Sequence, residues 1–269
     1  MKKWMYTVCF ATIIVSCNNQ QNGNNPTPTN TNEPKQLSYT LIATHPHDVN
    51  SFTEGLEFRN GFLYEGTGDT DYKGVSKLAK IDLATGKDIQ KINLSKEYFG
   101  EGITMLNNKI YQLTYRENKC FVYDANSFSK LKEFTYEGEG WGMTNDGKQL
   151  INSNGTNNIY FRDPETFAVT KTIAVSNNYG LLSSINELEY VDGFLYANIW
   201  TTFKIVKIDL NTGNVVAEIN LDDLLPKYAP EILNQPVDKG LNGIAYDSVG
   251  KRFFITGKYY PKIFEVKFN

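Results

Sequence analysis

The chain has 269 residues, which is enough for one large β domain or two smaller domains. Its net charge is −3 with 21% charged residues, so it lacks the excess of basic residues that nucleic-acid binding usually requires, and we expect no nucleic-acid partner. Aromatic residues make up 13% of the chain and suit half-buried strands, so the composition favours an all-β fold.

The N-terminal segment reads as a targeting signal. A basic start at residues 1–3 precedes a short apolar stretch, residues 4–15, which is too short to span a membrane comfortably. The stretch ends in Ile14-Val15-Ser16-Cys17, which resembles the lipobox of bacterial lipoproteins. The resemblance implies that Cys17 is acylated and anchors the protein at the bacterial cell envelope, on the periplasmic side or the cell surface. An ordinary secretory signal with a chance cysteine is the alternative.

The next residues are polar. Residues 18–36 consist mainly of Asn, Gln, Thr, Gly and Pro, with almost no side chain worth burying, and are predicted to form a disordered tether. We therefore expect three parts: a signal peptide at 1–17, a tether at 18–36 and a folded catalytic domain at 37–269. Contact with the membrane is expected through the lipid anchor only.

Five segments of the body repeat one pattern, a small or polar pair followed by an apolar alternation and a turn. They are residues 54–58, 101–105, 141–144, 186–190 and 242–246. The turns that follow include Asn60-Gly61 and Asp192-Gly193, which are strong hairpin signals. Repetition at this period predicts a repeat architecture.

Further strands follow each turn. Second strands are predicted at 62–67, 109–114, 149–154, 194–199 and 252–257, and third strands at 76–82, 119–124, 158–163, 203–209 and 262–268. Fourth strands are predicted at 88–94, 131–136, 169–175 and 215–221, so the fifth unit lacks one. The strand from Leu37 to Thr44 has no unit of its own and can complete it, which closes a ring and removes exposed strand edges.

The sequence therefore predicts an all-β fold, a five-bladed β-propeller closed by pairing of an N-terminal strand with the C-terminal blade. The repeats begin 47, 40, 45 and 56 residues apart, which fits four-stranded blades. The longest interval contains an insertion at 222–240. Five such units account for the folded part, so we expect no second domain and a monomer.

Two sets of equivalent positions are predicted to meet at one end of the ring. The inner-strand starts carry Glu54, Glu101, Trp141, Asn186 and Asn242, and the exits of the second strands carry Gly68, Tyr115, Gly155, Trp200 and Lys258. A repeat that only filled space would carry similar residues at all five positions. Aromatic walls with a few polar groups are instead typical of a small-molecule site. A carboxylate beside an apolar wall has a raised pKa, which suits proton transfer.

Histidine and cysteine offer little for a metal site. His45 and His47 are the two histidines, and a zinc site normally needs three or four ligands. Cys120 lies in the apolar run 120–123 and is predicted to be a packed strand residue. We predict no metal and no cofactor.

Seven stretches, which fall in all five units, resemble one family. They are 51–56, 98–104, 139–143, 186–190, 197–200, 241–245 and 256–258. Together they resemble the plant-type glutaminyl-peptide cyclotransferases, the five-bladed propeller glutaminyl cyclases of plants and bacteria. Such an enzyme converts the N-terminal glutamine of a peptide or protein to pyroglutamate and releases ammonia. The resemblance implies a metal-free reaction and a substrate with an N-terminal Gln.

The resemblance also implies roles for single residues. Glu101 is the expected general acid/base, and Lys258 and Asn186 are candidates to polarise the amide oxygen. The remaining expected positions contact the substrate; they are Phe52, Glu54, Phe99, Tyr115, Trp141, Trp200 and Asn242. Of these, Glu54 stands where the family has Glu or Gln and is expected to bind the amine. Tyr115 stands where relatives can have Trp, which affects only the shape of the pocket.

Two other classes of propeller are alternatives. A non-catalytic propeller at the cell envelope would bind peptides or proteins, because many propellers only bind. A propeller hydrolase or lyase acting on sugars or lactones often uses a metal held by several carboxylates and a histidine. The inner positions here offer two carboxylates, Glu54 and Glu101, and no histidine.

Overall fold

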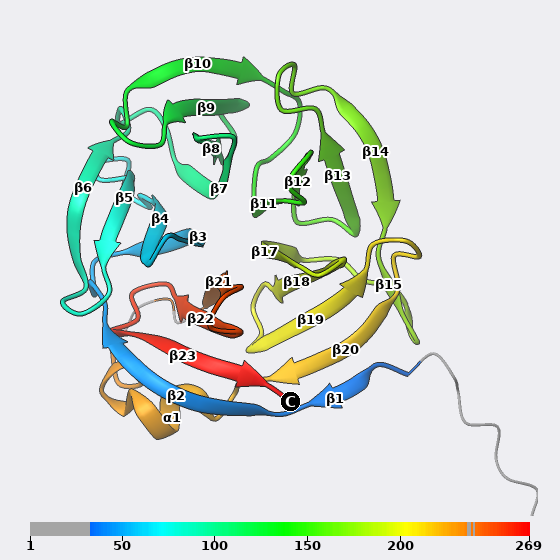
Figure 1. Cartoon of the computed structure of the whole chain (residues 1–269). Helices are drawn as coiled ribbons and strands as arrows, with labels where there is room; N and C mark the ends of the chain where they lie inside the picture. The colour runs from blue at the N-terminus through cyan, green and yellow to red at the C-terminus, as the bar shows by residue number, and fades with distance from the viewer. Residues whose placement is uncertain (1–32, 236–237, 239) are drawn as a thin grey trace, which may run out of the picture. The chain divides into compact units, whose positions relative to one another are not determined.

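The computed structural model describes residues 33–235, 238 and 240–269. The predicted signal peptide, the lipobox with Cys17 and most of the predicted tether lie outside these residues. The described part forms a ring of five sheets around a common centre, as Figure 1 shows. The predicted five-bladed propeller is confirmed.

Each blade is an antiparallel sheet whose first strand lies nearest the axis. Blade 1 contains β3 (Phe52–Arg59), β4 (Phe62–Gly68), β5 (Lys77–Asp82) and β6 (Lys87–Asn93), and blade 2 contains β7 (Gly100–Leu106), β8 (Lys109–Thr114), β9 (Lys119–Asp124) and β10 (Lys130–Thr135). Blade 3 contains β11 (Met143–Asn145), β12 (Leu150–Asn152), β13 (Asn158–Arg162) and β14 (Val169–Ala174). Blade 4 contains β17 (Ile185–Val191), β18 (Phe194–Ile199), β19 (Lys204–Asp209) and β20 (Val215–Asn220).

Blade 5 closes the ring. Its strands β21 (Leu241–Asp247), β22 (Arg252–Gly257) and β23 (Lys262–Phe268) are completed by β2 (Tyr39–Pro46) from the other end of the folded chain. The β2–β23 pairing is antiparallel and runs from Tyr39 opposite Phe268 to Pro46 opposite Lys262. The predicted closure by an N-terminal strand is therefore confirmed, and blade 5 obtains its fourth, outermost strand from the other end of the folded chain.

The structure adds one pairing that the sequence did not predict. Strand β1 (Lys35–Leu37) lies parallel to β20 of blade 4, with Lys35 opposite Ala217. Leu37 thus belongs to β1, and the closing strand begins at Tyr39 rather than at Leu37. The reason is that the chain enters along the outer edge of blade 4 before it reaches blade 5.

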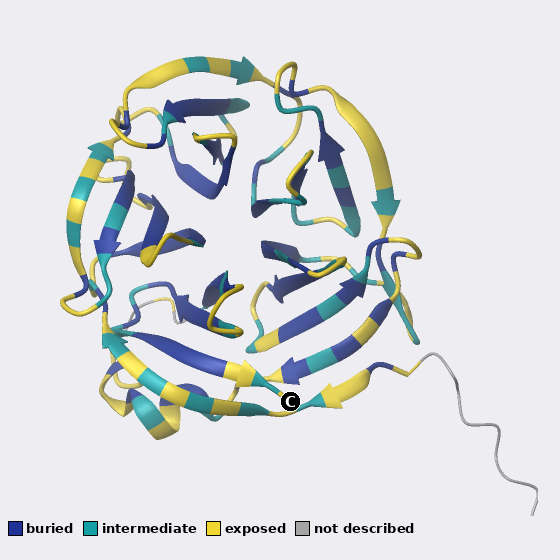
Figure 2. Ribbon diagram, viewed as in Figure 1, coloured by how far each residue is buried: buried dark blue, intermediate teal, exposed yellow. Residues whose placement is uncertain are grey.

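Burial falls from the axis to the rim, as Figure 2 shows. All seven residues of β7 are buried, whereas the outer strands β2 and β6 alternate between exposed and partly buried positions. This is the pattern of a sheet edge with one face packed on its neighbours and one face in water. Cys120 lies in β9 and is fully buried, which confirms its predicted place in the core.

A buried carboxylate joins three blades near the axis. Glu187 of blade 4 accepts hydrogen bonds from the backbone N–H groups of Leu56 in blade 1, at 3.3 Å, and Ile244 in blade 5, at 2.7 Å. Burial raises the pKa of Glu187 well above its usual range, against the effect of these two donors. The starts of the inner strands are therefore held in a fixed relation to one another.

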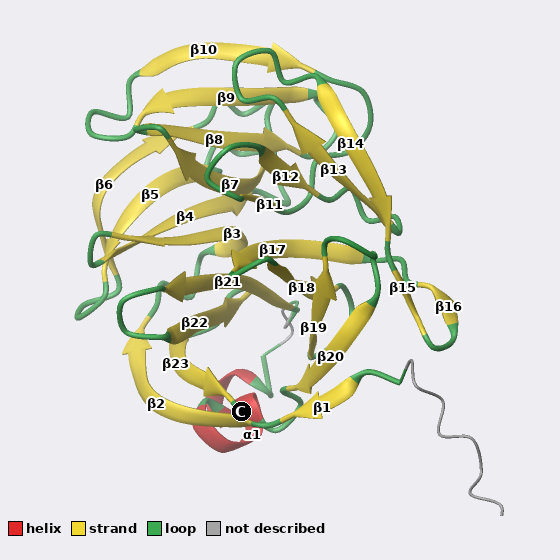
Figure 3. Cartoon of the chain, turned by 45° about the vertical axis from the view of Figure 1, so that its right-hand side comes forward, coloured by secondary structure: helices red, strands yellow, loops and turns green. Residues whose placement is uncertain are grey.

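Outside the blades, the described residues form two small additions. The insertion carries the helix α1 (Leu224–Tyr228) and the 3₁₀-helix η1 (Pro230–Ile232), which bury Leu224, Leu225 and Ile232 against blades 4 and 5. A hairpin of β15 (Ser176–Asn177) and β16 (Gly180–Leu181) projects from the rim in Figure 3. Within the described residues, neither helix has the length or apolar character needed to cross a bilayer.

Candidate active site

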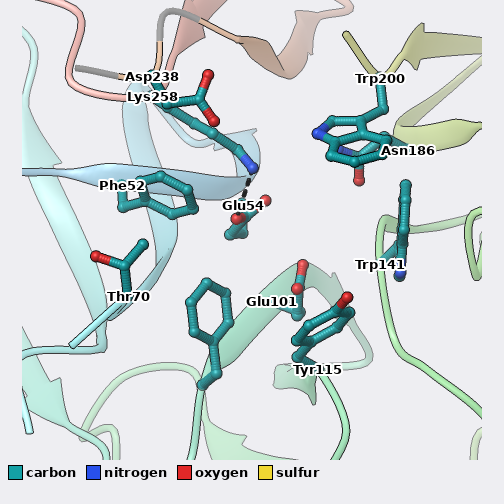
Figure 4. Close-up of a pocket in the computed structure, with 11 residues that line it drawn as sticks. Phe52, Glu54, Thr70, Glu101, Tyr115, Trp141, Asn186, Trp200, Asp238 and Lys258 are labelled. Carbon is teal, nitrogen blue, oxygen red and sulfur yellow. Dashed lines mark ion pairs between the residues drawn. The ribbon is translucent and has the colours of Figure 1, made fainter. Parts of the chain in front are cut away.

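A cavity of about 220 Å³ lies at the end of the ring where the inner strands begin. It is lined by Phe52, Glu54, Thr70, Phe99, Glu101, Tyr115, Trp141, Asn186, Trp200, Asp238 and Lys258 (Figure 4). Its volume is below the roughly 300–1,000 Å³ of pockets that take drug-sized ligands, so it suits a single small group. All five blades contribute to the lining or to the residues directly behind it.

The cavity brings together every predicted site residue of the folded domain except Asn242. Asn242 lies behind Glu54 and donates hydrogen bonds through Nδ2 to Glu54 Oε2, at 2.7 Å, and to the carbonyl oxygen of Thr53, at 3.0 Å. Its position therefore suits orientation of Glu54 rather than contact with a ligand. Thr70 and Asp238 also line the cavity and were not predicted, because both lie in loops outside the repeated segments.

Aromatic rings form two groups on the cavity wall. The Phe99 ring lies edge-on to Phe52, with centroids 5.9 Å apart, and beside Tyr115, at 5.8 Å. On the other side the indoles of Trp141 and Trp200 are nearly perpendicular, at 80° and 5.5 Å. Edge-to-face contacts of this kind hold rings in fixed orientations. The polar groups of the site therefore face an apolar and rigid enclosure.

Two glycines make room for these rings. A Cβ atom on Gly68 would lie 2.1 Å from Phe99 Cζ, and one on Gly155 would lie 2.5 Å from Trp141 Cζ2. Gly155 also has a φ of +77°, which favours glycine for a second reason. These two second-strand exits therefore leave space that the rings of Phe99 and Trp141 occupy.

An ion pair joins the first and last blades inside the cavity. Lys258 Nζ lies 3.0 Å from Glu54 Oε1 and 4.3 Å from the centre of the Phe52 ring. Burial raises the pKa of Glu54 to about 7, although Lys258 opposes this effect. Burial alone would lower the pKa of Lys258, but the Glu54 carboxylate outweighs it and the pKa is raised. Lys258 is therefore a cation in contact with an apolar ring and a carboxylate.

Glu101 has a different environment. Lys258 forms its ion pair with Glu54, so the Glu101 carboxylate remains available to a ligand in the middle of the cavity (Figure 4). Burial, and next the negative charge of Glu54, raise the pKa of Glu101 well above its ordinary range, and the charge of Lys258 only partly offsets them. A buried carboxyl group with a raised pKa holds its proton more tightly than an exposed one, which suits a group that both accepts and donates a proton.

Asn186 presents an unsatisfied amide to the same space. Its side chain lines the cavity and is 3% exposed, and its Oδ1 atom is buried without a hydrogen-bond partner. Buried polar atoms are rarely left unpaired, so this amide indicates a place where a ligand group binds. The Asn186 backbone is fixed by a hydrogen bond that Ser153 Oγ donates to its carbonyl oxygen, at 2.7 Å.

Glu139 organises the rim of the cavity. Its carboxylate accepts hydrogen bonds from Trp141 Nε1, at 3.1 Å, and Arg116 Nε, at 2.9 Å. The Arg116 guanidinium in turn lies 4.4 Å from the centre of the Tyr115 ring and donates to the Tyr115 hydroxyl. This rim links an aromatic side chain of blade 2 to one of blade 3.

Metal ligands are not grouped in the described part of the chain. Within it, no set of three or more His, Cys, Asp or Glu side chains is placed to hold a metal ion. His45 and His47 instead form separate hydrogen bonds with Glu265 and Glu65.

Comparison with known proteins identifies the family. The model of the glutamine cyclotransferase family matches residues 9–268. The chain belongs to the glutamine cyclotransferase family. A curated Arabidopsis thaliana protein named glutaminyl-peptide cyclotransferase is 38% identical over 232 residues, which span 84% of this chain and 70% of the relative. The predicted enzyme class, glutaminyl-peptide cyclotransferase, is thus confirmed.

A solved structure of the same family has the same fold. The crystal structure of Myxococcus xanthus glutaminyl cyclase superposes with a TM-score of 0.81 at 32% identity and covers 88% of this chain and 99% of its own. This match agrees with the five-bladed ring described above. In this cyclotransferase six of the seven resembling stretches contribute residues to one cavity, and the remaining stretch, 241–245, lies behind it through the contact of Asn242 with Glu54.

Substitution of Gly68 tests whether the aromatic wall sets the shape of the cavity. In Gly68→Ala the new Cβ would overlap the Phe99 ring and displace it, at a cost in stability of about 1–3 kcal/mol. Because displacement of about 1 Å can cost about a hundredfold in rate, we expect kcat/KM of the cyclotransferase reaction to fall at least about tenfold. The double variant Gly68→Ala/Phe99→Leu should recover part of this loss. Equal kcat/KM in Gly68→Ala and the parent enzyme would contradict the conclusion that the aromatic wall sets the shape of the cavity.

Proposed function

We propose that this enzyme converts an N-terminal glutamine of peptides or proteins to pyroglutamate and releases ammonia, with Glu101 as general acid/base. The observation that carries the proposal is the placement of the Glu101 carboxylate, the Lys258 ammonium and the Asn186 amide around one aromatic cavity in a member of this family. The Arabidopsis relative is named for the same chemistry.

The reaction is an intramolecular substitution. The α-amine nitrogen attacks the side-chain amide carbon of the same residue, a C–N bond closes a five-membered ring, and the bond to the amide nitrogen breaks. The attacking amine loses a proton, and the departing nitrogen gains one as ammonia. One carboxyl group between the two nitrogens can perform both transfers. The raised pKa of Glu101 brings its proton affinity closer to that of an α-amine, which favours such transfer.

The other groups have complementary roles. Lys258 Nζ and the Nδ2 donor of Asn186 stabilise the negative charge that develops on the amide oxygen, which is the role of preorganised donors in acyl transfer, while Asn186 Oδ1 can accept from an N–H group of the substrate. Glu54, held by Asn242 and Lys258, attracts the positively charged amine of the incoming substrate. The aromatic wall keeps the glutamine side chain folded so that the amine lies close to its own amide carbon.

The proposal predicts that turnover depends on the Glu101 carboxyl group. Ammonia release from a short Gln-initiated peptide should fall by at least about a hundredfold in Glu101→Gln, because the variant cannot transfer a proton. Glu137→Gln makes the same change at an exposed position and should leave turnover unaltered. Robust turnover by Glu101→Gln would overturn the role of Glu101. An inactive parent protein that still binds the peptide would favour the non-catalytic binding propeller.

The coupling between Glu54 and Glu101 predicts a pH effect. The Glu54 charge raises the pKa of Glu101, and it also neutralises Lys258, which would otherwise lower that pKa. In Glu54→Gln both changes lower the pKa of Glu101, so its ionised form persists to lower pH. We expect the acid limb of kcat/KM against pH to move to lower pH. In the control Glu57→Gln, another buried carboxylate outside the cavity, the limb should stay in place. A shift to higher pH in Glu54→Gln would contradict the coupling.

We propose further that the protein is a lipoprotein of the bacterial cell envelope, anchored through Cys17. The proposal rests on the basic start, the short apolar stretch and the sequence Ile14-Val15-Ser16-Cys17. The full chain, expressed in a bacterial host, should partition into detergent and carry acyl chains by mass spectrometry, and Cys17→Ser should remain in the aqueous phase. Equal partitioning of the two proteins would contradict the anchor.

A further inference from the structure

His47 and Glu65 form a fully buried pair beside the cavity, and the proposed chemistry does not use them. The Nε2 atom of His47 lies 2.8 Å from Glu65 Oε1, and both side chains have no exposed area. His47 comes from the segment that follows the closing strand β2, and Glu65 lies in β4 of blade 1. The other ring nitrogen, Nδ1, lies 2.7 Å from the carbonyl oxygen of Tyr260 in blade 5.

The contacts define the protonation of the pair. A carbonyl oxygen only accepts hydrogen bonds, so His47 Nδ1 carries a proton. The Glu65 carboxylate already accepts from Thr53 Oγ1, at 2.6 Å, and Ser51 Oγ, at 3.0 Å, which favours its ionised form. Burial alone would lower the pKa of His47, but Glu65 outweighs it and raises the pKa. The pair is therefore an imidazolium bound to a carboxylate.

Four hydrogen bonds from this pair and its neighbours fix two segments that carry cavity residues. Glu65 holds Ser51 and Thr53, the residues on either side of Phe52. The segment after Lys258 is held by the same region, because Tyr259 N donates to the Ser51 carbonyl, at 2.8 Å, and His47 N donates to the Pro261 carbonyl, at 3.0 Å. The segment that carries Phe52 and Glu54 and the segment that follows Lys258 are thus held by the same group of hydrogen bonds.

The shared attachment matters because the two segments belong to different blades. Glu54 and Phe52 come from blade 1, and Lys258 comes from blade 5, yet Lys258 Nζ must stay 3.0 Å from Glu54 and close to the Phe52 ring. The rings of Phe52 and Tyr259 also touch, with centroids 5.2 Å apart. A small shift between the blades would change all these distances together.

We propose that His47 and Glu65 are positioning residues for the cyclotransferase reaction, which hold Glu54, Phe52 and Lys258 in register across the junction of blades 1 and 5. This inference rests on the proposed function of the same cavity. A buried ion pair adds little net stability compared with apolar residues of equal size. Fixed orientation of the neighbouring segments therefore accounts for this pair better than a gain in stability does.

The chain contains a matched control for this pair. His45, two residues earlier in the chain, lies in β2 and forms a hydrogen bond with Glu265 in β23, at 2.8 Å. Neither His45 nor Glu265 lines the cavity or bonds to a residue that does. The change His45→Gln therefore removes a histidine–carboxylate hydrogen bond only two residues away in the chain without reaching the site.

The test compares His47→Gln, Glu65→Gln and His45→Gln in the full chain, at a temperature where circular dichroism shows each to be folded. We expect kcat for a Gln-initiated peptide to fall about tenfold or more in the first two variants, because misplacement of the charged groups acts on the transition state. KM should change less, since Trp141, Trp200 and Tyr115 lie on other blades. His45→Gln should keep kcat within about twofold of the parent. If His47→Gln and Glu65→Gln also stay within about twofold, the inference is wrong.

Two further measurements keep the test decisive. If neither buried variant folds, Thr53→Val removes only the hydroxyl donor to Glu65, and unchanged kcat in that variant would refute the positioning role, whereas a several-fold fall would support it. A crystal structure of His47→Gln or Thr53→Val does not depend on turnover. If the distance between Lys258 Nζ and Glu54 Oε1 in the variant exceeds the 3.0 Å of the parent, the result supports the inference. An unchanged ion pair would refute it. An inactive parent enzyme would instead count against the proposed function.

Discussion

The pairing of β2 with β23 is the constraint on which the site depends. It joins the two ends of the folded chain in one blade and so brings blade 5 against blade 1. The ion pair of Glu54 and Lys258 exists only because of this junction, since the two residues lie in the first and last blades. Glu187 secures the same relation nearer the axis through the backbones of Leu56 and Ile244. The pairing that closes the ring therefore also brings Glu54 and Lys258 together.

Within the cavity, burial raises the pKa of both Glu54 and Glu101, but the neighbouring charge with the largest effect opposes burial at Glu54 and adds to it at Glu101. Glu54 has a fixed cation and an amide donor, and its pKa rises only to about 7. Glu101 has neither, and the charge of Glu54 adds to the effect of burial, so its pKa lies well above its ordinary range. Two residues of the same type thus acquire different proton affinities from their surroundings alone. This division suits one group for attraction of a charged amine and the other for proton transfer.

The repeats explain how much of this could be predicted from the sequence. Alignment of five similar segments fixes the blades, the closing strand and the equivalent positions that line the cavity, because each position recurs at the same place in its blade. Thr70 and Asp238 lie in loops that the repeat does not cover, and the parallel pairing of β1 with β20 leaves no periodic signal in three residues. Glu65 had a signal, a charged residue in an apolar strand, but its partner His47 is set by ring closure and could not be identified from spacing.

The residues at the inner-strand starts and those at the second-strand exits contribute differently to the cavity, and this difference determines which positions can change its shape. The inner-strand starts carry Glu101, the residue proposed to transfer protons, and Glu187 ties the inner strands of blades 1, 4 and 5 to one another. The exits of the second strands, at Gly68, Tyr115, Gly155, Trp200 and Lys258, instead set where rings and empty space lie. Substitutions at Tyr115 and Trp200 would therefore change the shape of the cavity, whereas Gly68 and Gly155 leave no room for a side chain beside the rings of Phe99 and Trp141.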